Sequence, residues 1–293
     1  KQKTAYEIPL RLVGSEMCIR DRIHPPLFYH YRRNRYDITD CQESNNSLLR
    51  GQKPPTSNFS SLSGKMSKKI HLGGDEDDFF QSLADRLSRA GATLVVSPDD
   101  AEYVIHFGPE GDGNMVIVTP DQKISHPGLV VIIHDLLSPR GNSGHWGDEE
   151  LHIWAEMVRE DNINIDTLSN ILPRHWVNVR DVCDALCTII MSESSNSITG
   201  NLNISGRRSW SPESIVKEMS MLWGRYSDSL NYSHTVESLS SVPGPLSQEP
   251  NIQVERPDLS PLHKLLIECG SEGWYPLVPM RVSLMEIFAH AKE

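Results

Sequence analysis

Short apolar runs alternate with amphipathic segments along residues 66–293, and the two patterns predict different elements. Runs of four or five mostly apolar residues are typical of buried strands, and they occur at Lys69–Leu72, Thr93–Ser97, Tyr103–Phe107, Met115–Thr119, Leu129–Ile133 and around Leu202–Ile204. Apolar positions three and four residues apart predict helices over about Phe79–Ala90, Leu151–Val158 and Val182–Ile190, and after Ser211. Strands that alternate with helices in this order predict an α/β layer fold with a parallel sheet.

The stretch from Arg174 to Ser205 carries the clearest local signals. His175–Val179 alternates in the manner of a short strand, and Asp181 stands where a helix N-cap is expected. Ser211 followed by Pro212 predicts another helix start, because a capping hydroxyl precedes a proline at the first helical position. The stretch Ser227–Glu255 is rich in serine and proline and predicts a surface loop.

Gly73 and Gly74 separate the first strand from the first helix, which is the order that opens a dinucleotide-binding fold. Four acidic residues, Asp75–Asp78, follow directly and occupy the start of the helix. A helix N-terminus attracts phosphate because its free amides favour negative charge, so carboxylates there can cap the amides and repel a pyrophosphate. Two interpretations stay open: an acid-rich helix start on a degenerate fold, or a working NAD site with unusual loop geometry.

Several segments resemble motifs of the extended short-chain dehydrogenases/reductases, the NAD-dependent epimerases, dehydratases and decarboxylases of nucleotide sugars. The segment RHWVNVRDVCDAL at residues 174–186 is similar to R-x-F-V-x-V-x-D-V-x-x-A-L, and GNLNISG at 200–206 is similar to G-x-x-N-I-G. RPDLS at 256–260 and GWYP at 273–276 resemble the family's C-terminal motifs, with UDP-glucuronate decarboxylases and dTDP-glucose dehydratases the nearest likeness. The likeness is good from about Leu129 to the end and poor before it.

This resemblance implies a Rossmann-like parallel sheet over residues 66–293, with a small substrate-type lobe at about 205–293. It implies NAD as cofactor at Gly73 and Gly74, a nucleotide sugar as substrate and a homodimer as assembly. Glu76 and Phe79 stand where the family's glycine loop has its second and third glycines. By the resemblance, Arg174 and Arg256 reach the nucleotide diphosphate, although both also suit structural salt bridges.

Thr119 stands at the position of the family's catalytic Ser/Thr and is a relic of it by the resemblance. The family continues into a helix with Tyr-x-x-x-Lys, in which the tyrosine is the general acid/base. The chain contains no Tyr-x-x-x-Lys, and only residues 120–128 separate Thr119 from the next predicted strand. The resemblance therefore predicts a catalytically impaired nucleotide-sugar epimerase, dehydratase or decarboxylase. The alternative is a non-catalytic pseudoenzyme that binds a nucleotide sugar or a protein partner.

Residues 1–22 resemble the in-frame translation of two sequencing-library adapters, and we expect them to be an artefact. Residues 23–65 lack helical or strand periodicity and are interpreted as translated non-coding sequence or a disordered leader. The remaining 228 residues carry 17 Lys and Arg against 33 Asp and Glu, a net charge of −16. Such acidity disfavours nucleic acid and anionic membranes as partners.

The cysteines and the remaining polar clusters add no predicted metal site. Cys183 and Cys187 lie four residues apart on one predicted helix without a second ligand pair nearby, so they are interpreted as buried thiols. His145, Asp148–Glu150 and His152 lack a metal-binding spacing and predict a solvated loop and helix start. Few cysteines and no signal peptide indicate a reducing, cytoplasmic location.

Overall fold

The computed structural model describes residues 67–141, 146–164, 168, 170–237 and 254–290. The expectations for residues 1–22 and 23–65 lie outside these residues. So do most of the predicted serine-rich loop and His145.

Six parallel strands form one sheet in the order β2-β1-β3-β4-β5-β8, which confirms the predicted Rossmann-like α/β fold. The bounds are β1 Lys69–Gly73, β2 Thr93–Leu94, β3 Tyr103–Phe107, β4 Met115–Val118, β5 Leu129–Ile133 and β8 Gly200–Ile204. Strands β4 and β5 are buried on both faces, as their continuous apolar runs predict, whereas β3 alternates buried with half-buried residues.

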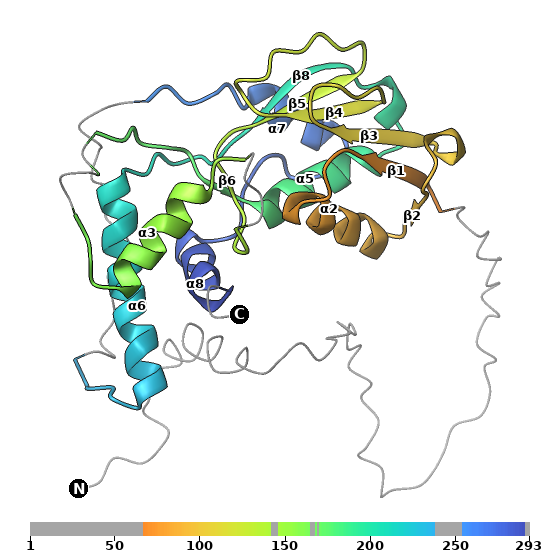
Figure 1. Ribbon diagram of the computed structural model, residues 1–293. Helices are drawn as coiled ribbons and strands as arrows, with labels where there is room; N and C mark the ends of the chain where they lie inside the picture. The colour runs from red at the N-terminus through yellow and green to blue at the C-terminus, as the bar shows by residue number, and fades with distance from the viewer. Residues whose placement is uncertain (1–66, 142–145, 165–167, 169, 238–253, 291–293) are drawn as a thin grey trace, which may run out of the picture. The chain divides into compact units, whose positions relative to one another are not determined.

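One face of the sheet is covered by helices (Figure 1). Helices α2 (Asp78–Arg89) and α5 (Val179–Ile190) pack against each other there, and α7 (Ser260–Glu268) contacts α5 and β8. Their apolar stripes join the main core, in which Phe79, Leu83 and Leu186 are fully buried. Arg86 on α2 pairs with Asp184 on α5 at the rim of this contact.

The opposite face of the central strands is covered by connecting loops instead. Residues 108–114 link β3 to β4 and residues 119–128 link β4 to β5, and neither link contains a helix. Parallel neighbours usually need a crossover of a dozen or more residues that contains a helix. Here Val116, Val118 and Val130 form a small cluster on this face, packed by Ile124 from the second loop.

A second group of helices packs apart from the sheet. It consists of α3 (Glu149–Arg159), α6 (Pro212–Asn231) and α8 (Met280–His290), which share a core around Trp154, Met219 and Phe288. A two-stranded parallel ladder, β6 (Leu136–Leu137) with β7 (Val177–Asn178), lies beside it. Two 3₁₀ turns, η2 (Pro98–Asp100) and η3 (Ser195–Ser197), complete the described elements.

Several predicted boundaries are wrong. Helix α5 begins at Val179 because Asn178 is its N-cap and accepts the Arg180 N–H at 2.9 Å, so Asp181 lies inside the first turn. This early start also shortens the predicted strand at 175–179 to Val177–Asn178.

Two more boundaries differ from the prediction. The strand at 93–97 ends at Leu94, because Ser97 already caps the 3₁₀ turn that follows. Helix α6 continues to Asn231, so the serine-rich stretch begins as helix rather than as loop. Among the described residues, no helix combines the length and apolarity that crossing a bilayer requires.

Candidate functional site

The predicted site residues gather at one edge of the sheet, where the parallel strands end. In open α/β sheets, ligands bind outside the carboxyl ends of the strands. Gly73 ends β1, and Gly74 follows in the left-handed region with φ of 108°. A Cβ built on Gly74 would lie 2.4 Å from the Phe107 carbonyl oxygen, so this turn requires glycine because it presses on the end of β3.

Thr119 lies directly after β4 and is buried. Its hydroxyl donates to Asp121 Oδ1 at 2.5 Å, and its amide donates to Gln122 Oε1 at 3.1 Å. The hydroxyl bond lowers the pKa of the Asp121 carboxyl. These bonds build a turn that directs the chain back toward β5, at the position where the resembled family has its catalytic helix.

The residues at the start of α2 do not fit a bound dinucleotide. Asp77 caps the helix, and its Oδ1 accepts the Phe80 N–H at 2.9 Å. Its other oxygen, Oδ2, accepts the Trp146 indole N–H at 2.6 Å. A cofactor pyrophosphate would need these amides and would meet a carboxylate. Of the two interpretations left open by the sequence, this geometry favours the acid-rich helix start on a degenerate fold.

Arg174 lies at the same edge and is engaged by its own chain. Its Nη1 donates to the Gly147 carbonyl oxygen at 3.1 Å, and its Nη2 pairs with Glu150 Oε1 at 3.0 Å. Asp135 Oδ1 lies 3.9 Å away, and the guanidinium stands over the Trp176 ring at 5.3 Å. Arg174 therefore makes ion pairs within its own chain.

Arg256 is exposed, and its Nη1 donates to the Arg207 carbonyl oxygen at 3.1 Å. It lies close enough to His175 to act on that ring. Burial lowers the pKa of His175, Asp135 opposes this shift, and Arg256 and His134 add to it. The structure thus brings Arg174 and Arg256 to one region around residues 174–176. Gly73 lies instead at the end of β1, and Thr119 directly follows β4.

A cleft of about 190 Å³ opens between the residues after β8 and the segment before α8. Its walls combine aromatic, basic and apolar side chains, namely Leu137, Trp176, Asn178, Arg207, Arg208, Trp210, Pro276, Val278, Met280 and Ser283, with Gly206. The Arg208 guanidinium stands over the Trp210 ring at 4.2 Å, and that of Arg207 over Tyr275 at 5.1 Å. Cationic groups beside aromatic faces suit a ligand that is anionic at one end and planar at the other.

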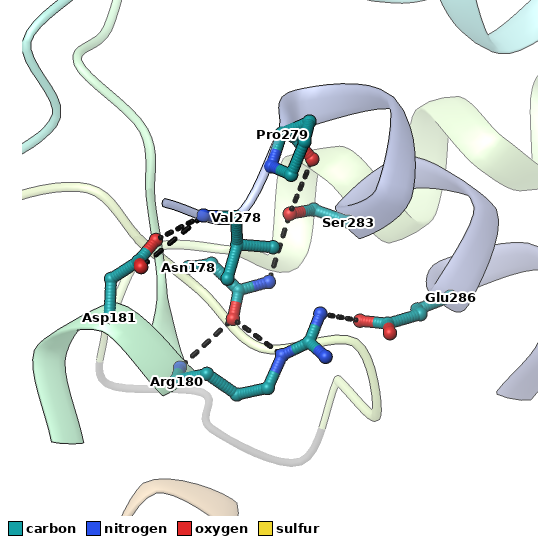
Figure 2. A network of polar contacts seen from close by, with 7 residues as sticks. All are labelled: Asn178, Arg180, Asp181, Val278, Pro279, Ser283 and Glu286. Atoms are coloured by element: carbon teal, nitrogen blue, oxygen red, sulfur yellow. Dashed lines mark hydrogen bonds and ion pairs between the residues drawn. The ribbon is translucent and has the colours of Figure 1, made fainter. Parts of the chain in front are cut away.

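Polar contacts join the start of helix α5 to α8 and the segment before it (Figure 2), and residues 276–283 form one wall of this cleft. The Asp181 carboxylate accepts the Leu277 N–H at 2.8 Å and the Val278 N–H at 3.2 Å. The Asn178 amide donates to the Ser283 hydroxyl at 2.9 Å. Arg180 pairs with Glu286 on α8 at 2.8 Å. Three polar residues at the start of α5, Asn178, Arg180 and Asp181, therefore hold the wall formed by residues 276–283.

Other sequence expectations are refined by the structure. Cys183 and Cys187 are buried free thiols in the main core, and burial raises the pKa of both. The expectation that residues 148–152 are solvated is wrong for Asp148, which is fully buried and accepts the Ser138 N–H at 3.1 Å.

The sequence analysis missed Trp146 and the group Arg207, Arg208 and Trp210. The second group follows β8 immediately, and the rule that ligands bind beyond the carboxyl ends of parallel strands could have identified it. No sequence signal identifies Trp146, because its hydrogen bond to Asp77, 69 residues earlier, depends on the tertiary fold.

Solved structures that are similar to this chain include several enzymes with a pyridine nucleotide bound. WbmF from Bordetella bronchiseptica in complex with NADH is 9% identical, with a TM-score of 0.50 over 77% of this chain and 92% of that one. UDP-glucose 4-epimerase from Thermus thermophilus in complex with NAD is 11% identical, with a TM-score of 0.48 over 76% of this chain and 99% of that one.

GDP-mannoheptose C4 reductase from Campylobacter jejuni with NADP bound is 11% identical, with a TM-score of 0.47 over 78% of this chain and 99% of that one. No family model matches the chain. No curated protein matches it either. Among these comparisons, the likeness to WbmF supports the Rossmann-like fold and nothing beyond the fold.

Proposed function

We propose that this protein is a non-catalytic relative of the extended short-chain dehydrogenases/reductases that binds a nucleotide sugar in the cleft between β8 and α8. The motifs at 174–186, 200–206, 256–260 and 273–276 support the family, and the fold agrees with it. The observation that carries the proposal is the composition of the cleft, which is lined by Trp176, Trp210, Arg207 and Arg208, with the Arg208 guanidinium over the Trp210 ring.

The cleft is small for a whole nucleotide sugar. Its 190 Å³ lies below the 300–1,000 Å³ that is typical of pockets for drug-sized ligands. It suits one part of such a ligand, with the base against Trp176 or Trp210. The diphosphate then lies toward the rim, where Arg207 and Arg256 are exposed and linked by one hydrogen bond.

The proposal assigns no turnover to this protein. The reaction of the family requires a positioned general acid/base, and residues 119–128 form a turn that offers neither tyrosine nor helix. Arg174 has a supporting role here, since Gly147, Glu150 and Asp135 already surround its guanidinium. The proposal also includes a reducing cytoplasmic location, consistent with three free cysteines among the described residues, and a homodimer as in the family.

Calorimetric titration with UDP tests the proposal. We expect UDP to bind the full chain and Arg207→Gln to weaken it about 10- to 100-fold, because a charge-assisted hydrogen bond contributes about 1.5–3 kcal/mol. Arg89→Gln is the matched control, since it removes an equal charge from an exposed pair with Asp85 on α2. Absence of UDP binding, or equal affinity in the Arg207 variant, would overturn the proposal.

A further inference from the structure

The first turn of α2 is covered by a residue that comes 69 positions later in the chain. Both oxygens of the Asp77 carboxylate are used, one by the Phe80 amide and one by the Trp146 indole. A helix N-terminus that follows the first strand of a parallel sheet is the usual place for a dinucleotide phosphate. Here a carboxylate supplies the negative charge that the helix end attracts.

Trp146 also supplies aromatic area at this position. Its ring meets Phe79 edge to face at 5.2 Å and Phe107 at 6.3 Å, and its side chain is 7% exposed. Phe79 and Phe107 meet each other in the same way at 5.2 Å. This three-ring cluster closes the carboxyl ends of β1 and β3 and belongs to the main core.

Arg174 anchors the segment that carries Trp146. Its guanidinium binds the carbonyl of Gly147 and the carboxylate of Glu150, so it holds the segment 146–150 at two points. Gly147 adopts φ of 93°, and a Cβ there would lie 3.3 Å from Arg174 Nη1. Asp148 adds a buried bond to the Ser138 amide.

We infer that residues 146–150 are an internal occupant of the cofactor position, in which Trp146 and Asp77 take the place of a dinucleotide. Arg174 is a positioning residue that holds this segment rather than a contact to an external phosphate. The inference goes beyond the proposed nucleotide-sugar site, because it concerns the N-terminal turn of α2 and assigns a role to Arg174.

Hydrogen exchange of the full chain tests this inference, read in peptides that cover residues 77–83. Trp146→Ala should raise amide exchange in the first turn of α2 about 10-fold or more, and Trp146→Phe should give a smaller rise because it keeps a ring but loses the indole N–H. Unchanged exchange in both variants would overturn the inference. If the Trp146→Ala variant does not fold, the exchange measured in Trp146→Phe decides the test.

The role of Arg174 is tested in the same experiment. Arg174→Gln should raise exchange both in residues 146–150 and in the first turn of α2, and Arg174→Lys should restore part of the protection. Arg89→Gln on the exposed side of α2 is the control and should change neither region. An effect of Arg174→Gln confined to residues 146–150 would refute its role in holding Trp146 on Asp77.

Addition of NAD⁺ tests whether the cofactor position is open. The inference predicts that 1 mM NAD⁺ gives the wild-type chain no added protection at residues 77–83. Protection of this turn by NAD⁺ would show an open cofactor site and refute the internal occupant. A failure of UDP to bind would leave all three of these results unchanged, so the two proposals fail separately.

Discussion

His175 shows how the surroundings of one residue at the site determine its charge. The side chain is 5% exposed, and burial lowers its pKa from the ordinary value of 6.5. A histidine with a lowered folded-state pKa stabilises the fold above its unfolded pKa, and this contribution is lost as the pH falls below 6.5. Arg256 and His134 strengthen the shift, and Asp135 opposes it.

Removal of Arg256 should therefore raise the pKa of His175. We predict an upward shift in Arg256→Gln, because the neighbouring cation disfavours a second positive charge. An NMR titration of the His175 ring resonances measures it, with Arg89→Gln as a variant of equal charge change elsewhere. An unchanged titration in Arg256→Gln would place Arg256 away from His175 in solution.

Tyr103 carries a buried polar atom without a visible role. Its ring is fully buried beneath β1 and α2, Lys68 stands over the ring at 4.8 Å, and burial raises the pKa of its hydroxyl. The hydroxyl has no hydrogen-bond partner among the described residues. A buried donor left unsatisfied costs free energy, so its removal at constant shape is neutral or stabilising.

Tyr103→Phe should accordingly raise the free energy of unfolding by about 1 kcal/mol. Urea denaturation of both proteins measures the change, and Tyr232→Phe is a control at an exposed tyrosine. A loss of stability in Tyr103→Phe would reveal a hydrogen bond that the hydroxyl makes in solution.

Asp181 is one of the residues through which α5 contacts the C-terminal segment. Burial raises the pKa of Asp181, while the Leu277 and Val278 amides and Arg180 act in the opposite direction and Asp184 adds to the rise. A raised folded-state pKa means that the folded chain holds the proton more tightly. Its contribution to stability is therefore full below the ordinary value of 3.8 and is lost as the pH rises through the folded-state value.

Asp181→Asn should remove this pH dependence. We predict that the stability of the wild type falls relative to Asp181→Asn as the pH rises from about 3.8 through the raised pKa, because only the wild type gives up the proton. Urea denaturation of both proteins at a series of pH values gives the difference. A difference that stays constant with pH, or rises over this range, would contradict the assigned shift.

The same helix shows what the sequence could and could not predict about single elements. The strands β3 and β5 were predicted with their observed bounds, because each is a run of five mostly apolar residues. The N-cap of α5 was not predicted correctly, because Asn178 and Asp181 are both good capping residues by type. Asp181 is taken by amides 96 and 97 residues away, which no local pattern reveals.

At the scale of the whole molecule, the sheet has helices on one face and loops on the other face of its central strands (Figure 1). The short connection at 119–128 was visible in the sequence, and it correctly predicted the missing helix. The cleft was not predicted, since it forms where residues 206–210 meet residues 276–283 across a long stretch of chain. The motifs identified Arg174 and Arg256 as residues of interest, but the groups that these arginines contact could not be predicted from the sequence.

Thermal unfolding of the full chain with UDP-glucose and with NAD⁺ in parallel tests the central claim most directly. A ligand that binds only the folded state at 100 times its Kd stabilises it by about 2.7 kcal/mol, or several degrees in Tm. We predict that saturating UDP-glucose raises the Tm and that NAD⁺ at 1 mM leaves it unchanged. A rise with NAD⁺, or none with UDP-glucose, would contradict a sugar-nucleotide-binding protein that has lost its cofactor site.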